Sequence, residues 1–95
     1  MARELTEPRL EKFNKEGDEH TGVLVEIETS NINGKPVPKF LMEDAKGDLF
    51  FILGTEDLKK KIRRNHVGLA LSVKWEATEA INGQQMRRFK VMASS

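Results

Sequence analysis

Residues 21–28 alternate in polarity along their length, and this two-residue period constrains the fold more than any other feature of the sequence. Val23, Val25 and Ile27 share one parity, which is the pattern of a strand with one buried face. Further strands are predicted at the apolar runs 37–43 and 49–53 and at the alternating segments 69–76 and 85–92. The sequence therefore predicts an all-β fold with five strands.

Turn-forming residues separate these segments. Residues 29–36 include the pair Asn33 and Gly34, which suits a turn with positive φ, and Asn82 and Gly83 form a second such pair. Residues 44–47 join the second and third strands. Short connections of this kind link antiparallel neighbours, so the strands are predicted to pair in sequence as hairpins.

One segment breaks the strand pattern and is predicted to be a helix of two to three turns. Thr55 is a good N-cap, and Leu58 and Ile62 are four residues apart. Five basic residues load the far end of this segment: Lys59, Lys60, Lys61, Arg63 and Arg64. Because cations at a helix C-terminus complement the macrodipole, we interpret this group as a solvated face and assign it no binding role.

Composition restricts the classes of protein that this chain can belong to. The 95 residues suffice for one domain, and the absence of cysteine excludes disulfides and thiolate metal sites. Sixteen basic residues against 15 acidic ones give a net charge of +1, so a nucleic-acid role must rest on where the charges lie. No apolar run suits a signal peptide or a membrane span, which predicts a cytoplasmic protein with no membrane partner.

The order of these elements resembles that of OB-fold (oligonucleotide/oligosaccharide-binding) domains over residues 21–92. The residues that carry the resemblance are Gly22, Phe40, Met42, Asp44, Gly47, Leu49, Phe51, Thr55 and Gly68. It implies a five-stranded antiparallel OB-type barrel with one short α-helix between the third and fourth strands. Residues 19–93 are predicted to form this domain, and residues 1–18 an N-terminal segment that is either a short helix or disordered.

The resemblance also implies a binding face. In OB domains, oligonucleotides and oligosaccharides bind the outer face of the second and third strands, here flanked by the loops 29–36 and 77–84. If Phe40, Met42, Leu49 and Phe51 fill the barrel, Phe50 faces outward as a platform for base stacking. The predicted nucleic-acid contacts are Lys35, Lys39, Leu41, Phe50, Ile52, Lys74, Arg87, Arg88 and Lys90. The leading hypothesis is a module that binds single-stranded DNA or RNA.

Two alternatives remain open. The N-terminal segment, through Leu10 or Phe13, or a second protomer covers the outward face. In a separate alternative, the face contacts another protein or a copy of this chain, which is then a protein-interaction or homo-oligomerising module that uses Leu41, Phe50 and Ile52; the near-neutral charge favours this reading. A monomer whose own N-terminal segment covers the face would rule that module out. No catalytic constellation appears, so we predict neither an enzyme, a cofactor nor a metal site. Trp75 is assigned to packing at the end of the barrel.

Overall fold

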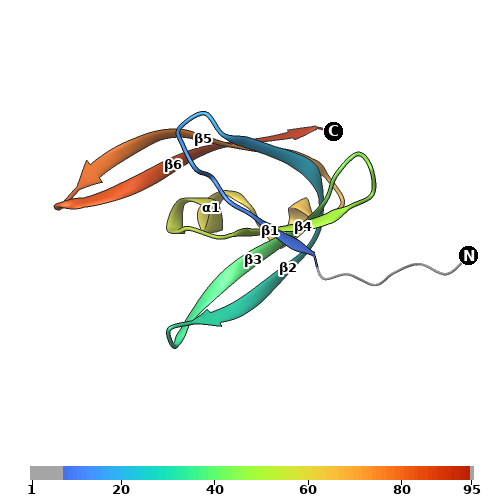
Figure 1. The fold of residues 1–95 in the computed structure, drawn as a ribbon, viewed down its shortest axis with the longest axis horizontal. Helices are drawn as coiled ribbons and strands as arrows, with labels where there is room; N and C mark the ends of the chain where they lie inside the picture. Colours follow the sequence, from blue (N-terminus) through green and yellow to red (C-terminus); the bar gives the residue numbers. More distant parts are fainter. Residues whose placement is uncertain (1–7, 95) are drawn as a thin grey trace, which may run out of the picture.

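A six-stranded sheet curls into a half-barrel in the computed structural model, which describes residues 8–94 (Figure 1). The strands are β1 (Arg9–Glu11), β2 (Glu19–Ile32), β3 (Lys35–Glu43), β4 (Leu49–Leu53), β5 (Ala70–Ile81) and β6 (Gln84–Ser94). Their order across the sheet is β1-β4-β3-β2-β5-β6. The helix α1 (Glu56–Lys61) and the 3-10 turn η1 (Arg64–His66) connect β4 to β5. Neither of these helices is long and apolar enough to cross a membrane.

The predicted all-β class and the helix between the third and fourth predicted strands are confirmed. The prediction of five antiparallel strands is wrong, because β1 adds a sixth strand that pairs in parallel with β4, with Arg9 opposite Phe50. Within residues 8–18 of the N-terminal segment, the structure has the strand β1 at Arg9–Glu11 and no helix. The first seven residues of that segment lie outside the described residues. A sheet that does not close leaves one side of β4 unpaired, and β1 takes up those backbone groups.

Both long hairpins turn at Asn-Gly, as predicted. Asn33 and Gly34 have φ of 52° and 77°, and Asn82 and Gly83 have φ of 50° and 77°. Positive φ at both central residues defines a type I′ turn, whose twist matches that of the flanking strands. The two hairpins extend beyond the half-barrel as projecting arms (Figure 1).

The core contains apolar side chains from every strand except β1. Its buried members are Phe13, Leu24, Phe40, Met42, Phe50, Ile52, Leu58, Ile62, Leu71, Val73 and Phe89. Phe40 and Met42 fill the half-barrel as predicted. The predicted orientation of β4 is wrong: Phe50 and Ile52 are 3% and 1% exposed. Since cross-strand partners share a face, the pairing of Phe40 with Ile52 turns Phe51 outward.

Phe13 fills the space between the two ends of the sheet, where β1 and β6 do not pair. Its ring centroid lies 4.9 Å from that of Phe89 and 4.7 Å from that of His20, both edge to face. The loop that follows is fixed to β5 by hydrogen bonds from Gly17 N to Trp75 O (2.7 Å) and from Trp75 N to Asp18 O (2.9 Å). The N-terminal segment therefore helps to complete the core.

Asp57 joins α1 to β6. Its carboxylate is 5% exposed and accepts hydrogen bonds from Phe89 N (2.8 Å), Lys61 Nζ (2.7 Å) and Arg88 Nη1 (3.2 Å). Burial raises the pKa of Asp57, but these donors outweigh that effect, so its pKa lies below the ordinary value. A buried carboxylate with three donors fixes the helix against the sheet.

Candidate functional site

The outer surface of β3 and β4 presents an aromatic ring with a cation over it. Lys39 pairs across the strands with Leu53, and Leu41 pairs with Phe51, so these four side chains share the outer face. The Nζ atom of Lys39 lies 4.3 Å from the centroid of the Phe51 ring. At this distance the ammonium and the ring attract each other. All four side chains are half-buried and keep solvent-facing surface.

A hollow of about 500 Å³ lies beside this pair, and we call it the outer-face groove. Leu10 from β1 and Ile32 from β2 are its most exposed apolar members, at 43% and 39%. The groove therefore crosses the outer face from β1 to β2. Its lining residues are Pro8, Leu10, Ser30, Ile32, Lys39, Phe51 and Leu53. The lining is mainly apolar, and Lys39 is its one charged residue.

Carboxylates balance the cations around the groove. Glu28 pairs with Lys39 across β2 and β3, and Glu26 pairs with Leu41, so both lie on the outer face. Glu43 at the end of β3 has the same parity. Because exposed charges of both signs largely cancel at a distance, this face has little long-range attraction for phosphate. The surface that this face offers is therefore aromatic and apolar rather than strongly charged.

Two of the predicted contacts lie outside this site. Phe50 and Ile52 were expected to face a ligand, but both side chains are buried in the core and present no surface for stacking. Lys39 and Leu41 lie on the outer face, as expected. Lys35 is exposed beside the turn of the β2–β3 arm.

The four remaining predicted contacts lie on β6 and its partner β5. Lys74 and Lys90 are cross-strand partners and are both exposed, but neither lines the groove. Arg88 is bound to Asp57 and to Glu79, whose carboxylate lies 3.0 Å from its Nε. These ion pairs give Arg88 a structural role.

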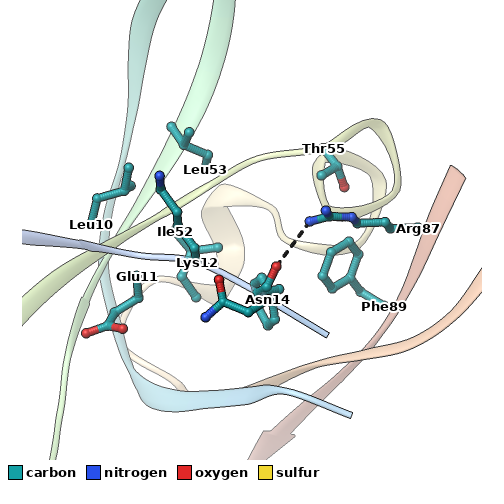
Figure 2. A pocket seen from close by; sticks show the side chains of 10 residues that line it. Leu10, Glu11, Lys12, Asn14, Ile52, Leu53, Thr55, Arg87 and Phe89 are labelled. Carbon is teal, nitrogen blue, oxygen red and sulfur yellow. Dashed lines mark hydrogen bonds between the residues drawn. The ribbon is translucent and has the colours of Figure 1, made fainter. Parts of the chain in front are cut away.

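Arg87 points to the inner side of the sheet, where a second hollow of about 430 Å³ opens between β1 and β6. Figure 2 shows this seam pocket, which is lined by Leu10, Glu11, Lys12, Phe13, Asn14, Ile52, Leu53, Thr55, Arg87 and Phe89. Arg87 Nη1 donates to Phe13 O at 3.4 Å, and the guanidinium lies 4.1 Å from the centroid of the Trp75 ring. Trp75 packs against the core, as predicted.

The seam pocket and the outer-face groove are neighbours, because Leu10 and Leu53 line both. Sequence reasoning missed this connection along with Phe51 and Leu53. All five residues of β4 are apolar, so their alternation carries no signal of which side faces the core. The strand β1 has three residues, which are too few to show a period.

No metal site is formed within residues 8–94, since no group of three His, Asp or Glu side chains is placed to hold an ion. Comparisons with protein-family models, curated proteins and solved structures gave no match to this chain. The function must therefore be argued from the geometry of the two hollows and the charges around them.

Proposed function

We propose that this chain is a single-stranded nucleic-acid binding module of the OB type, which holds DNA or RNA in the outer-face groove. The observation that carries the proposal is the outward ring of Phe51 with the Lys39 ammonium 4.3 Å from its centroid. An aromatic platform beside a cation suits a strand whose bases stack while its phosphates meet positive charge.

The fold supports the OB assignment through its element order. Three strands, a short helix and two strands (β2, β3, β4, α1, β5 and β6) follow one another, and the sheet is left partly open. OB domains bind oligonucleotides on the face of their second and third strands, between two flanking loops. The matching strands here are β3 and β4, and the matching loops are the two Asn-Gly arms.

Each side chain in the groove has a separate role in this proposal. One base stacks on Phe51, worth about 1 to 3 kcal/mol. Leu10, Ile32 and Leu53 contact the sugar and the flat faces of neighbouring bases, and Lys39 meets a phosphate. A strand that continues past Leu53 enters the seam pocket, where Arg87 supplies the next cation.

Fluorescence anisotropy with a labelled oligo-dT tests the groove. We expect Phe51→Ala to weaken binding by about 5- to 150-fold, because the stacking contribution is lost. Phe51→Leu keeps apolar bulk without the ring and should lose most of the same affinity. Leu49→Ala is the matched control, since Leu49 is exposed on the same strand and the same face but lies outside the groove. Unchanged affinity in Phe51→Ala would overturn the assignment of the groove.

A second candidate is self-association through the outer face, favoured by its charge pattern. Lys39 and Glu28 lie side by side across two strands, and a two-fold contact between copies places each beside its opposite. The exposed Leu10 and Ile32 supply apolar contact area. Sedimentation equilibrium decides: a dimer that Leu10→Glu dissociates supports this candidate, and a monomer at the highest soluble concentration rejects it.

A further inference from the structure

The basic residues of the chain are concentrated in one short segment. Five of the 16 lie within residues 59–64, so the rest of the chain carries net negative charge. The overall value of +1 therefore hides a strongly polarised surface. Within this segment, Lys59, Lys60, Arg63 and Arg64 are all exposed, and we call these four the α1–η1 basic surface.

Dipole complementation does not account for so many cations. The helix α1 has six residues, and a helix terminus carries about half an elementary charge. Lys61 already bonds Asp57 at the end of this helix. Among residues 8–94, none of the four cations of the basic surface forms an ion pair; Arg63 only donates to Lys60 O, at 3.4 Å. These four cations are hydrated, and no carboxylate in the described part of the chain neutralises them by direct contact.

The surface is held rigidly and carries charge alone. Leu58 and Ile62, the apolar residues of the segment, are 0% and 3% exposed and belong to the core. Insertion into a bilayer needs an exposed apolar face beside the basic one, and this segment turns its own inward. The chemistry that remains is contact with a polyanion through phosphate groups.

The position of α1 connects this surface to the groove. Leu53 lines both hollows, and Thr55, which caps α1 by accepting from Leu58 N at 3.2 Å, lines the seam pocket. The hollows and the helix therefore follow one another along the molecule. Lys59 N donates to Thr55 O at 2.9 Å, so the first of the four cations lies one helical turn from the seam pocket.

We propose that the α1–η1 basic surface binds the phosphates of the nucleic-acid strand whose bases occupy the outer-face groove. This inference rests on the proposed function and adds the electrostatic contribution that the groove lacks. The groove holds bases, and the basic surface supplies most of the salt-dependent affinity.

The test is a salt titration of the binding of an oligo-dT that is long enough to span both regions. The variant combines four substitutions: Lys59→Gln, Lys60→Gln, Arg63→Gln and Arg64→Gln. Each phosphate contact on a single strand contributes about 0.7 to the slope of log K against log salt. We expect the combined variant to have a slope shallower by about 2 to 3 and to bind about tenfold or more weakly at low salt.

The matched control replaces two other exposed lysines, Lys15 and Lys46, by glutamine and is compared with the double variant Lys59→Gln and Lys60→Gln. It changes the net charge by the same amount as that double variant and leaves both hollows intact, so its slope should stay near that of the unmodified chain. Circular dichroism confirms that all three variants remain folded, which the exposure of every replaced side chain favours.

The outcomes separate this inference from the proposed function. An unchanged slope in the combined variant, with binding still lost in Phe51→Ala, overturns the basic surface and leaves the groove. A reduced slope with normal binding in Phe51→Ala overturns the groove and the inference that one strand spans both regions, and it leaves the basic surface as a separate phosphate site. Binding to phosphatidylserine vesicles without binding to oligo-dT overturns both and indicates a membrane partner.

Discussion

The two hairpin arms have the same type of turn but differ in how they are attached to the half-barrel. Each reverses at Asn-Gly after an isoleucine, with nearly the same backbone angles. The β5–β6 arm is fixed by Arg88, which bonds Glu79 and Asp57, and by Arg87 on Trp75. Within the described residues, the outer half of the β2–β3 arm forms no ion pair. Turn chemistry makes a hairpin, and distant contacts decide how firmly it is held.

Removing Asp57, which bonds Arg88 of the β5–β6 arm, should cause the largest loss of stability. The β5–β6 arm would then be held as loosely as the β2–β3 arm. We expect Asp57→Ala to lower the free energy of unfolding by about 3 kcal/mol, because it leaves the buried Phe89 N–H without a partner and removes one carboxylate from the half-buried Arg88. Urea denaturation measures the loss. Asp57→Asn keeps one oxygen as an acceptor and should lose less. A cost below about 1 kcal/mol for Asp57→Ala contradicts this role.

Acid should weaken the contacts of Asp57 without a mutation, by protonating its carboxylate. The pKa of Asp57 is lower in the folded protein than its ordinary value of 3.8, so the carboxylate adds stability above 3.8. That contribution is lost as the pH falls through the lowered folded pKa. We expect the unfolding free energy of Asp57→Asn to depend less on pH in this acidic range. Parallel pH profiles for the two proteins would show that other carboxyl groups cause the acid sensitivity.

Alanine at the two turns should cause a smaller loss of stability, and it tests whether the two arms differ in how firmly they are held. Asn tolerates positive φ through local hydrogen bonds of its short polar side chain, which alanine lacks, so Asn33→Ala and Asn82→Ala should each cost up to about 1 to 2 kcal/mol. In the anchored β5–β6 arm the strain should appear in global stability. In the β2–β3 arm we expect faster amide exchange near the turn and little global change. Equal global losses in the two variants would show that the arms are equally fixed.

Local signals in the sequence predicted the turns and the helix cap but not the buried face of β2: Leu24 is 0% exposed, whereas Val23 and Val25 are 37% and 40% exposed, and a bulge follows Leu24. The Asn-Gly turns and the Thr55 cap depend on neighbours within four residues, and both were predicted correctly. The orientation of β4 depends on its register with β3, and five consecutive apolar residues conceal it. The position of β1 depends on Phe50, 41 residues along the chain, so its pairing has no local signal.

The candidate site was predicted only where the strand alternates clearly. Lys39 and Leu41 belong to β3, whose buried Phe40 and Met42 set the parity. The aromatic residue on the outer face is Phe51 and not the predicted Phe50, because the prediction assigned the opposite parity to β4. The basic residues after Lys59 were assigned to the helix dipole, and the six-residue length of α1 and the absence of ion pairs for four of them change that interpretation.

The contacts at Phe89 also bear on association between copies. β6 is the last strand of the sheet, and a free outer strand is a template for pairing with another chain. Asp57 accepts from Phe89 N, and Lys61 donates to Phe89 O, so both backbone groups that an incoming strand needs there are already occupied. Protonation of Asp57 weakens the contact at Phe89 N and leaves that of Lys61 with Phe89 O, so acid is expected to remove one of the two contacts that protect β6 from intermolecular pairing.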